Sequence, residues 1–392
     1  MERNNLIKKT LTVVVILIFI SVSVFPSTGT LLLDKLPWVT PRDYITYVDD
    51  DRFVNRLFLK EQIDILHPKA YNFHRSNKLN GLVFSPEDIE LKDDAFQGSN
   101  TFHFVEWWYF DAMLNEGYSL HVSIHVIGVM ERYFVVVYLD IYKNGVPEVK
   151  EKKIYFMDEL NISTDVPLIA IDGKQVMKGF IDQATGKWIY NVSLEIGESL
   201  VDLQFIGCVK GWKGRISIGG WAVILPKAEV SGKIRVNGMD VNVVGIGYHD
   251  HNWEITLKAY MNFGWYWGRI ISNNLTITWF LIMNTRISGQ LLLVINKGKE
   301  YYINIEPDNI HFKPGDFDIK NGRFIPHNFV IMADAQNVSL LAVLTSIGTD
   351  HGTSSLIRHY CRYHVKSQGS ITVDSQVETI NGIQIAESMR FR

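Results

Sequence analysis

The stretch YFVVVYLDIYKNGV, from Tyr133 to Val146, decides the fold class of this chain. Ten residues that are nearly all β-branched, aromatic or aliphatic precede Asn144-Gly145, the strongest short signal for a hairpin turn. The pattern recurs in KIRVNGMDVNVV (Asn237-Gly238), LLLVINKGKEYYINI (Lys297-Gly298), ETINGIQIAE (Asn381-Gly382) and RIISNNLTITWFLIM (Ser272-Asn273-Asn274). No segment after residue 100 shows apolar residues at helical spacing for three turns. The sequence therefore predicts an all-β, antiparallel protein.

The organisation follows from strands that are apolar on both faces, such as Tyr133–Tyr142. Such strands need cover on both sides, so we expect two β units packed against each other. We place the seam near Gly219 to Gly232, which divides the chain into residues 1–30, 31–225 and 226–392. The proline-broken segment Leu31–Asn100 is expected to wrap the first unit instead of folding alone.

The N-terminus resembles an export signal. Arg3, Lys8 and Lys9 precede the apolar run Leu11–Phe25, which is short for a helix that spans a bilayer of ~30 Å. We therefore expect a signal peptide, or a membrane anchor if it is not cleaved, with the β units outside the cytoplasm.

Composition excludes some functions. The chain has 392 residues, of which 47% are hydrophobic, and its net charge is −3, so no basic field favours nucleic acid. Cys208 and Cys361 form no disulfide framework, and we expect two buried thiols.

Three clusters carry the residues that suit chemistry. They are FHFVEWWYFDA (Phe102–Ala112), GYHDHNWE (Gly247–Glu254) and FGWYWGR (Phe263–Arg269). In a strand, alternate residues share a face, so Tyr248, Asp250 and Asn252 lie opposite His249, His251 and Trp253. Concentrated tryptophan suggests either a rigid apolar cavity or a core packed with aromatic rings.

These motifs, in this order, resemble the lipocalin-like superfamily of carotenoid 1,2-hydratase (hydroxyneurosporene synthase) and the AttH-type secreted proteins. The resemblance implies two lipocalin-like, or calycin-like, β-barrels packed together, with a deep apolar pocket for an isoprenoid or lipid-like molecule between them. It also implies a hydratase or cyclase with no metal or organic cofactor, in which an acid protonates an alkene and aromatic rings stabilise the carbocation.

Carried over to this chain, the resemblance makes Asp250 the proton donor and Tyr248 its neighbour. The expected substrate-binding residues are Glu106, Trp107, Trp108, Trp221, His249, His251, Asn252, Trp253, Trp265 and Trp267. Such a donor must stay protonated near neutral pH, and burial among aromatic rings raises the pKa of an aspartic acid. A protonated histidine beside Asp250 would instead lower that pKa.

Three alternatives remain open at this stage. Asp250 and Asn252 could tie loops together without a catalytic role. The protein could carry a lipid-like molecule without changing it. Finally, His249 and His251 could join His121 and His125 in a metal site, since histidines on adjacent strands make good zinc or iron ligands.

Overall fold

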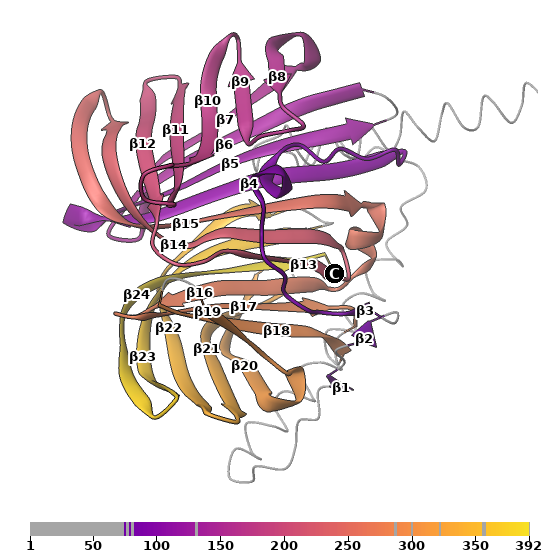
Figure 1. Ribbon diagram of the computed structural model, residues 1–392, viewed down its shortest axis with the longest axis vertical. Coiled ribbons are helices and arrows are strands. Elements are labelled where there is room, and N and C mark those ends of the chain that lie inside the picture. Colours follow the sequence, from indigo (N-terminus) through magenta and orange to yellow (C-terminus); the bar gives the residue numbers. More distant parts are fainter. Residues whose placement is uncertain are drawn as a thin grey trace, which may run out of the picture.

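The protein consists of two large sheets packed face to face, in which every pair of strands is antiparallel except the short parallel pair of β1 and β18 (Figure 1). This computed structural model describes residues 74–75, 78–79, 82–129, 132–285, 288–298, 301–320, 323–354 and 358–391. Its regular elements are strands and short 3-10 turns, which confirms the predicted all-β fold. The expected signal or anchor, residues 1–30, lies outside the described residues. Within them, no helix has the length and apolar character needed to cross a membrane.

The first sheet has twelve strands and curls into a nearly closed barrel. Its strands are β4 (His103–Leu114), β5 (Tyr118–Val129), β6 (Arg132–Lys143), β7 (Val146–Phe156), β8 (Leu160–Ile162), β9 (Leu168–Ile171), β10 (Lys174–Ile181), β11 (Trp188–Ile196), β12 (Ser199–Gly207), β13 (Trp212–Ile216), β14 (Gly219–Val236) and β15 (Met239–Thr256). They run in the order β7-β6-β5-β4-β15-β14-β12-β11-β10-β9-β8, with β13 paired to β14. The long strands β4, β14 and β15 therefore form its centre.

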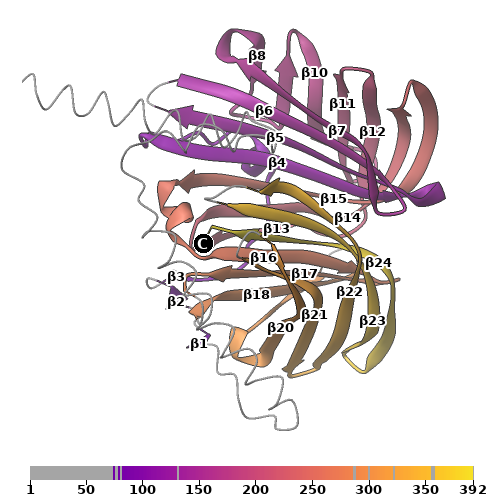
Figure 2. The same ribbon diagram turned by 180° about the vertical axis from the view of Figure 1, so that it is seen from behind.

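The second sheet has ten strands and is strongly curved, as seen from behind in Figure 2. Its strands are β1 (His74–Arg75), β16 (Gly264–Ile271), β17 (Leu275–Met283), β18 (Ser288–Lys297), β19 (Tyr301–Ile305), β20 (Ile310–Lys320), β21 (Arg323–Ala335), β22 (Val338–Ser354), β23 (His359–Val373) and β24 (Gln376–Arg390). They run in the order β1-β18-β17-β16-β24-β23-β22-β21-β20, with β19 paired to β18, so β20 is an edge. The two expected barrels are thus one nearly closed barrel and one curved sheet.

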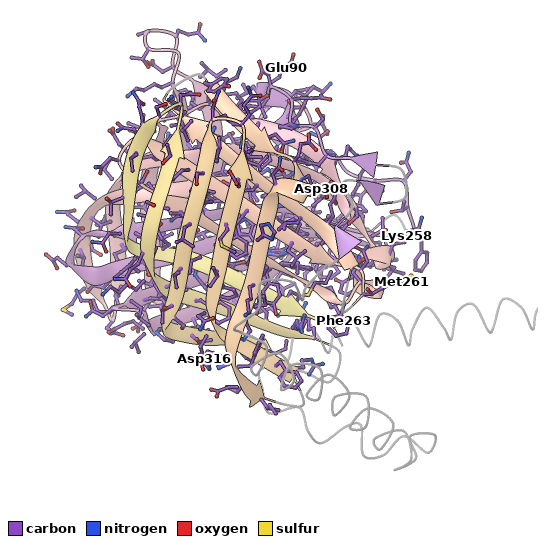
Figure 3. The ribbon with its side chains drawn as sticks, turned by 90° about the horizontal axis from the view of Figure 1, so that it is seen from below. Glu90, Lys258, Met261, Phe263, Asp308 and Asp316 are labelled. Carbon is purple, nitrogen blue, oxygen red and sulfur yellow. The ribbon has the colours of Figure 1, made fainter. Side chains whose placement is uncertain are left out.

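Minor elements connect the strands. They are the hairpin of β2 (Lys78–Leu79) and β3 (Leu82–Val83), and the 3-10 turns η2 (Leu91–Asp94), η3 (Asn115–Gly117), η4 (Met157–Glu159), η5 (Leu257–Met261) and η6 (Pro307–Asn309). The chain passes from the first sheet to the second through η5, where Figure 3 labels Lys258, Met261 and Phe263. The division drawn from the sequence after residue 225 falls inside β14, which pairs with first-sheet strands on both sides.

Most of the expected turns are confirmed. Asn144-Gly145 and Asn237-Gly238 have positive φ at both positions and close β6–β7 and β14–β15. The predicted turn at Asn381-Gly382 is wrong, because both residues lie inside β24. The hairpin before β24 instead turns at Asp374-Ser375, which also adopt positive φ, a conformation that aspartate tolerates.

Three apolar layers fill the molecule. One fills the first barrel, around residues such as Phe110 and Tyr190, and a second fills the concave side of the second sheet, around Trp279 and Phe329. The third lies between the sheets. Its members include Tyr109, Trp221, Tyr248, Trp267 and Phe280, which come from both sheets. This middle layer positions the candidate site.

Candidate functional site

The site begins with the pairing of β4 and β15, which brings two sequence clusters side by side. Asp250 pairs with Tyr109, and Tyr248 pairs with Asp111. Because successive side chains alternate across a strand, these four residues point toward the second sheet. The predicted alternation along Gly247–Glu254 is confirmed for these residues, and Asp250 points into the layer between the sheets.

Asp250 is a buried carboxyl group with neutral donors around it. Its Oδ2 accepts hydrogen bonds from the indole N–H of Trp221 at 2.9 Å and the hydroxyl of Tyr248 at 2.7 Å. The amide of Asn252 lies 3.3 Å from Oδ1. Only 5% of the residue is exposed, and among the described residues no cation forms an ion pair with it.

Burial therefore decides the protonation of Asp250. It raises the pKa of this carboxyl group to about 7, against the opposing effect of the Trp221 and Tyr248 hydrogen bonds. The negative charges of Glu387 and Asp111 raise it further. The histidines that could have lowered this pKa lie on the opposite face of β15, in contact with residues of the barrel interior. Asp250 is thus protonated in a large fraction of molecules near neutral pH.

Aromatic rings of both sheets surround this carboxyl group. The rings of Tyr248 and Trp267 have centroids 5.2 Å apart, and Tyr109 lies 5.4 Å from Trp267. On the other side, Trp221 lies 5.3 Å from Phe280. Electron-rich ring faces thus gather within one layer, where they can stabilise a positive charge.

A charged network lies next to the aromatic layer. Arg269 donates to Asp111, with its Nε 3.0 Å from Oδ1. Arg362 donates to Glu387 at 2.7 Å and also to the Tyr109 hydroxyl, which itself lies 2.8 Å from Glu387. Two arginines thus balance two carboxylates, Asp111 and Glu387, and leave none for Asp250.

Sequence reasoning did not assign a role to this network. Asp111 and Arg269 lie in the quoted clusters, but Arg362 and Glu387 come from strands about which the resemblance says nothing. Both are buried charged residues in strands that carry many other polar residues, so the local sequence does not mark them.

Four of the other predicted residues on β4 and β15 face the interior of the first barrel and contact η2 and its flanks. His249 Nε2 lies 3.0 Å from Asp94, and His251 Nε2 lies 2.9 Å from Glu106. The Trp108 indole donates to the Asp94 carbonyl oxygen at 2.9 Å. Because these contacts end on η2 and its flanks, His249, His251, Glu106 and Trp108 do not meet Asp250.

The metal alternative that combined four histidines is wrong for the same reason. His121 and His125 on β5 contact Asp140 and Trp107, on the face toward the second sheet. His249 and His251 contact acids on the barrel side. The sheet itself separates the two pairs.

The remaining predicted tryptophans lie farther along the same layers. Trp107 stacks on His125, with centroids 5.6 Å apart, and Trp265 packs edge-on against Phe391. Both belong to the layer between the sheets and are half-buried. Trp253 packs beside His251 on the barrel side. Of the ten expected substrate-binding residues, Trp221, Asn252 and Trp267 are therefore the ones grouped around Asp250 and Tyr248.

Two surface hollows of the described residues lie away from Asp250. One of about 600 Å³ is lined by Glu195, Gly197, Glu198, Arg235, Gly238 and Asp240, at hairpin turns of the first sheet. The other, of about 200 Å³, lies at hairpin turns of the second sheet. Beside Asp250, which is buried, aromatic side chains of the layer between the sheets pack together.

Comparison with known proteins bears on the fold. No protein-family model matches the chain, and no curated protein matches its sequence. A crystal structure of an AttH protein from Nitrosomonas europaea aligns with 78% of this chain and 97% of its own length, at 12% identity and a TM-score of 0.57. The predicted resemblance to the lipocalin-like hydratase and AttH group is confirmed as a likeness of fold.

Two further solved structures are more distant. The alignment with the structure of CghA spans 74% of this chain and 88% of the CghA chain, at 9% identity and a TM-score of 0.47. The alignment with kievitone hydratase from Nectria haematococca spans 73% of this chain and 88% of the hydratase chain, at 10% identity and a TM-score of 0.45.

Proposed function

We propose that this protein protonates an alkene of an isoprenoid or similar lipid-like molecule at Asp250, and so acts as a hydratase (a hydro-lyase) or a cyclase (an isomerase). The observation that carries the proposal is a buried carboxyl group that accepts two neutral hydrogen bonds and has no cationic partner among the described residues. The neighbouring buried carboxylates Asp111 and Glu387 are, in contrast, each paired with an arginine.

The geometry suggests which oxygen carries the proton. Oδ2 already accepts hydrogens from Trp221 and Tyr248, so the acidic proton belongs on Oδ1, whose one contact is the long one to Asn252. The alkene π electrons take this proton and form a C–H bond, which leaves a tertiary carbocation and the Asp250 carboxylate. The Trp221 and Tyr248 donors then stabilise the carboxylate.

The surrounding rings supply the second requirement. The carbocation lies against the faces of Trp267, Trp221 and Phe280, where cation–π attraction lowers its energy in a site that excludes bulk water. In hydration, water adds to the cation and its proton returns to Asp250, so one water is consumed per turnover. In cyclisation, a second alkene of the substrate attacks the cation, and a proton is returned from carbon.

Export of the chain is a further part of this proposal. The basic residues before Leu11–Phe25 support it, and a prenyl lipid is a ligand expected at a membrane surface. Cell fractionation with N-terminal sequencing of the mature protein tests whether the segment is removed, kept as an anchor, or not recognised as a signal.

The first experiment identifies the ligand. Native mass spectrometry and lipid extraction are applied to full-length protein from a membrane-containing host. A co-purifying prenyl or polyene lipid supports the proposal, and incubation in D₂O then shows whether deuterium enters the product carbon. Asp250→Asn should abolish deuterium incorporation while binding persists. Binding without any turnover in the wild type would indicate a carrier, and the absence of lipid would contradict both functions.

A further inference from the structure

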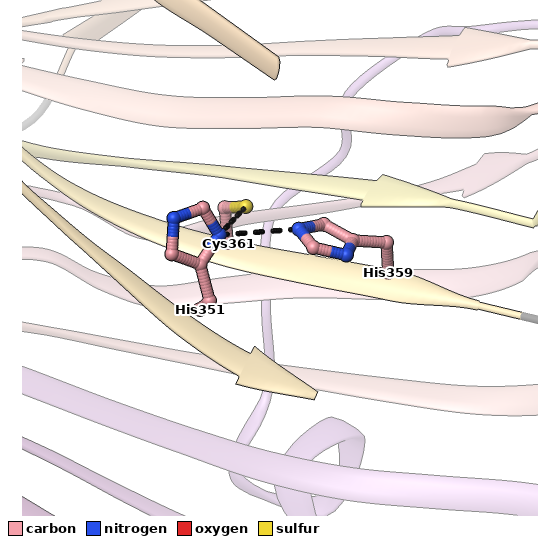
Figure 4. Close-up of side chains that lie close together, drawn as sticks. All are labelled: His351, His359 and Cys361. Carbon is pink, nitrogen blue, oxygen red and sulfur yellow. Dashed lines mark hydrogen bonds between the residues drawn. The ribbon is translucent and has the colours of Figure 1, made fainter. Parts of the chain in front are cut away.

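A cluster of three metal-ligating side chains lies in the second sheet, apart from the site around Asp250. It consists of His351 on β22 and His359 and Cys361 on β23 (Figure 4). His351 Nδ1 lies 3.2 Å from His359 Nε2 and 3.3 Å from Cys361 Sγ. All three atoms lie within 4.8 Å of one another. His359 and Cys361 are fully buried, whereas His351 is half-buried.

The backbone explains how the three side chains meet. His359 and Cys361 are two apart on β23, so they share the face that lines the interior of the second sheet. On β22 the pairing register shifts between Asp350 and Thr353, which places His351 and Gly352 opposite Cys361. Such a bulge redirects a side chain, and here His351 turns toward the other two.

We propose that His351 Nδ1, His359 Nε2 and Cys361 Sγ bind one zinc ion, or another transition metal that accepts nitrogen and sulfur ligands. With Zn–N of ~2.0–2.1 Å and Zn–S of ~2.3 Å, tetrahedral ligands stand roughly 3.3–3.6 Å apart. The observed separations of 3.2 and 3.3 Å are close to these values. On binding, the thiol releases its proton to solvent and the sulfur coordinates as thiolate.

The surroundings indicate the type of site. Three protein ligands leave one of four tetrahedral positions, and the partial exposure of His351 allows water to fill it. His359 is fully buried, and it is the neutral form of an imidazole that ligates metals. Lys320 and Arg323 act electrostatically on His359, and thiolate formation at Cys361 together with Asp350 offsets their charge.

The site is independent of the proposed proton donor. Cys361 faces the interior of the second sheet, whereas the next residue, Arg362, points the other way and donates to Glu387 between the sheets. A metal bound at Cys361 would therefore lie on the opposite face of β23 from the layer that holds Asp250. The competing explanation is that a His–His–Cys hydrogen-bond chain fills the same space without a metal.

The test is a cobalt titration of full-length protein that has been stripped with a chelator. Wild type should bind one equivalent of Co²⁺ with thiolate-to-cobalt charge-transfer absorption, and Zn²⁺ should displace it. Cys361→Ser should remove the charge-transfer bands and weaken binding by more than the ~10–100-fold that loss of an outer-shell partner causes. Cys208→Ser is the matched control, because Cys208 is the chain's other cysteine and lies outside the cluster. It should behave like the wild type.

Two results would overturn the proposal. In the first, wild type takes up no stoichiometric cobalt, which leaves the hydrogen-bond chain as the explanation. In the second, Cys361→Ser keeps the full spectrum and affinity, which would place the metal elsewhere. If Cys361→Ser does not fold, as judged by near-ultraviolet circular dichroism, His351→Gln at the half-buried position serves instead. It should keep the sulfur bands but with altered d–d absorption and weaker binding.

Discussion

At the residue scale, and among the described residues, Asp250 differs from Asp111 and Glu387 because no cation forms an ion pair with it. Its pKa of about 7 lies well above the ~3.9 expected in the unfolded chain. Between these values the folded state holds more protons than the unfolded state. The free energy of unfolding therefore falls as pH rises from about 4 to about 7, and is flat beyond.

Asp250→Asn should remove this pH dependence. The folded-state pKa of about 7 lies roughly three pH units above the unfolded value, at ~1.36 kcal/mol for each. The free energy of unfolding of the variant should therefore exceed that of the wild type by as much as ~4 kcal/mol at pH 8, with no difference at pH 4. Urea unfolding at the two pH values measures the difference, with the exposed Asp165→Asn as the control. An equal effect of Asp250→Asn at both values would show that Asp250 ionises normally.

Catalysis should depend on the same proton. Asp250→Asn should lower kcat by roughly 10²–10⁴-fold, the usual contribution of a general acid, and the wild-type rate should fall tenfold per pH unit above about 7. Tyr248→Phe removes a donor that favours the carboxylate, so the pKa of Asp250 rises and the falling limb moves to higher pH. A pH–rate profile measures this, and a shift to lower pH would contradict the assigned role.

For the buried pair of Arg269 and Asp111 we expect the opposite effect on stability from that of Asp250→Asn, namely a loss. Arg269→Met leaves Asp111 without its hydrogen-bonded arginine, and loss of one partner of a buried pair typically destabilises by ~3–5 kcal/mol. Adding Asp111→Leu should recover much of the loss in urea unfolding. The exposed pair of Arg215 and Glu254 is the control, where Arg215→Met should change stability by less than ~1 kcal/mol. No recovery in the double variant would mean that Arg269 acts through packing alone.

At the element scale, η2 and its flanks are held against the barrel interior by polar contacts. Glu106 accepts hydrogen bonds from the backbone N–H groups of Gln97 and Gly98, both at 2.8 Å, besides its contact with His251. Asp94 accepts from Tyr190 at 2.6 Å. His249 and His251 thus fix a segment that precedes β4, a structural role that the sequence clusters alone did not reveal.

Glu106→Leu should release this segment. Each buried donor left without an acceptor costs ~1–3 kcal/mol, so amide hydrogen exchange at Leu91–Gly98 should accelerate. Glu106→Gln retains an acceptor for the backbone and should show a smaller effect. Peptides from β20, on the far edge of the second sheet, are the internal control. Unchanged exchange at η2 would show that packing of Trp108, not Glu106, holds it.

The sequence predicted these elements where local chemistry was decisive. Strand alternation placed Asp250 and His251 on opposite faces, and Asn-Gly pairs marked two turns correctly. The same dipeptide failed at Asn381-Gly382, because pairing with the long strand β23 outweighs its local preference. A dipeptide indicates a turn only where the flanking strands end, and strand ends depend on partners that are distant in sequence.

At the scale of the whole molecule, the site depends on contacts that no local pattern encodes. Tyr109 meets Glu387 across 278 positions of the chain, and Arg269 meets Asp111 across 158. Each side chain alone is an ordinary strand residue. The packing of the two sheets pairs Arg269 with Asp111 and buries Asp250, which raises the pKa of Asp250. The chemistry inferred from the sequence therefore required a protonated Asp250. The physical cause of that protonation, however, lies in the tertiary structure.

The same contacts should make the two sheets unfold together. Besides the Arg269 and Arg362 networks, Ser119 lies 2.7 Å from His364, and Lys150 donates to Asp350 at 2.7 Å. Separating the sheets would expose the middle apolar layer and leave Asp111 of the first sheet without Arg269 of the second. We therefore expect no populated intermediate in which one sheet is unfolded and the other is intact.

We expect a single unfolding transition in urea. Under native conditions, the free energy of opening measured by amide hydrogen exchange should be the same for β5 and β23. Arg269→Met should lower protection equally in both strands, although Arg269 itself lies on β16. Hydrogen exchange with mass spectrometry measures this strand by strand. If β5 kept its protection while β23 lost it, the sheets would be separate folding units, and the site between them could open without unfolding either.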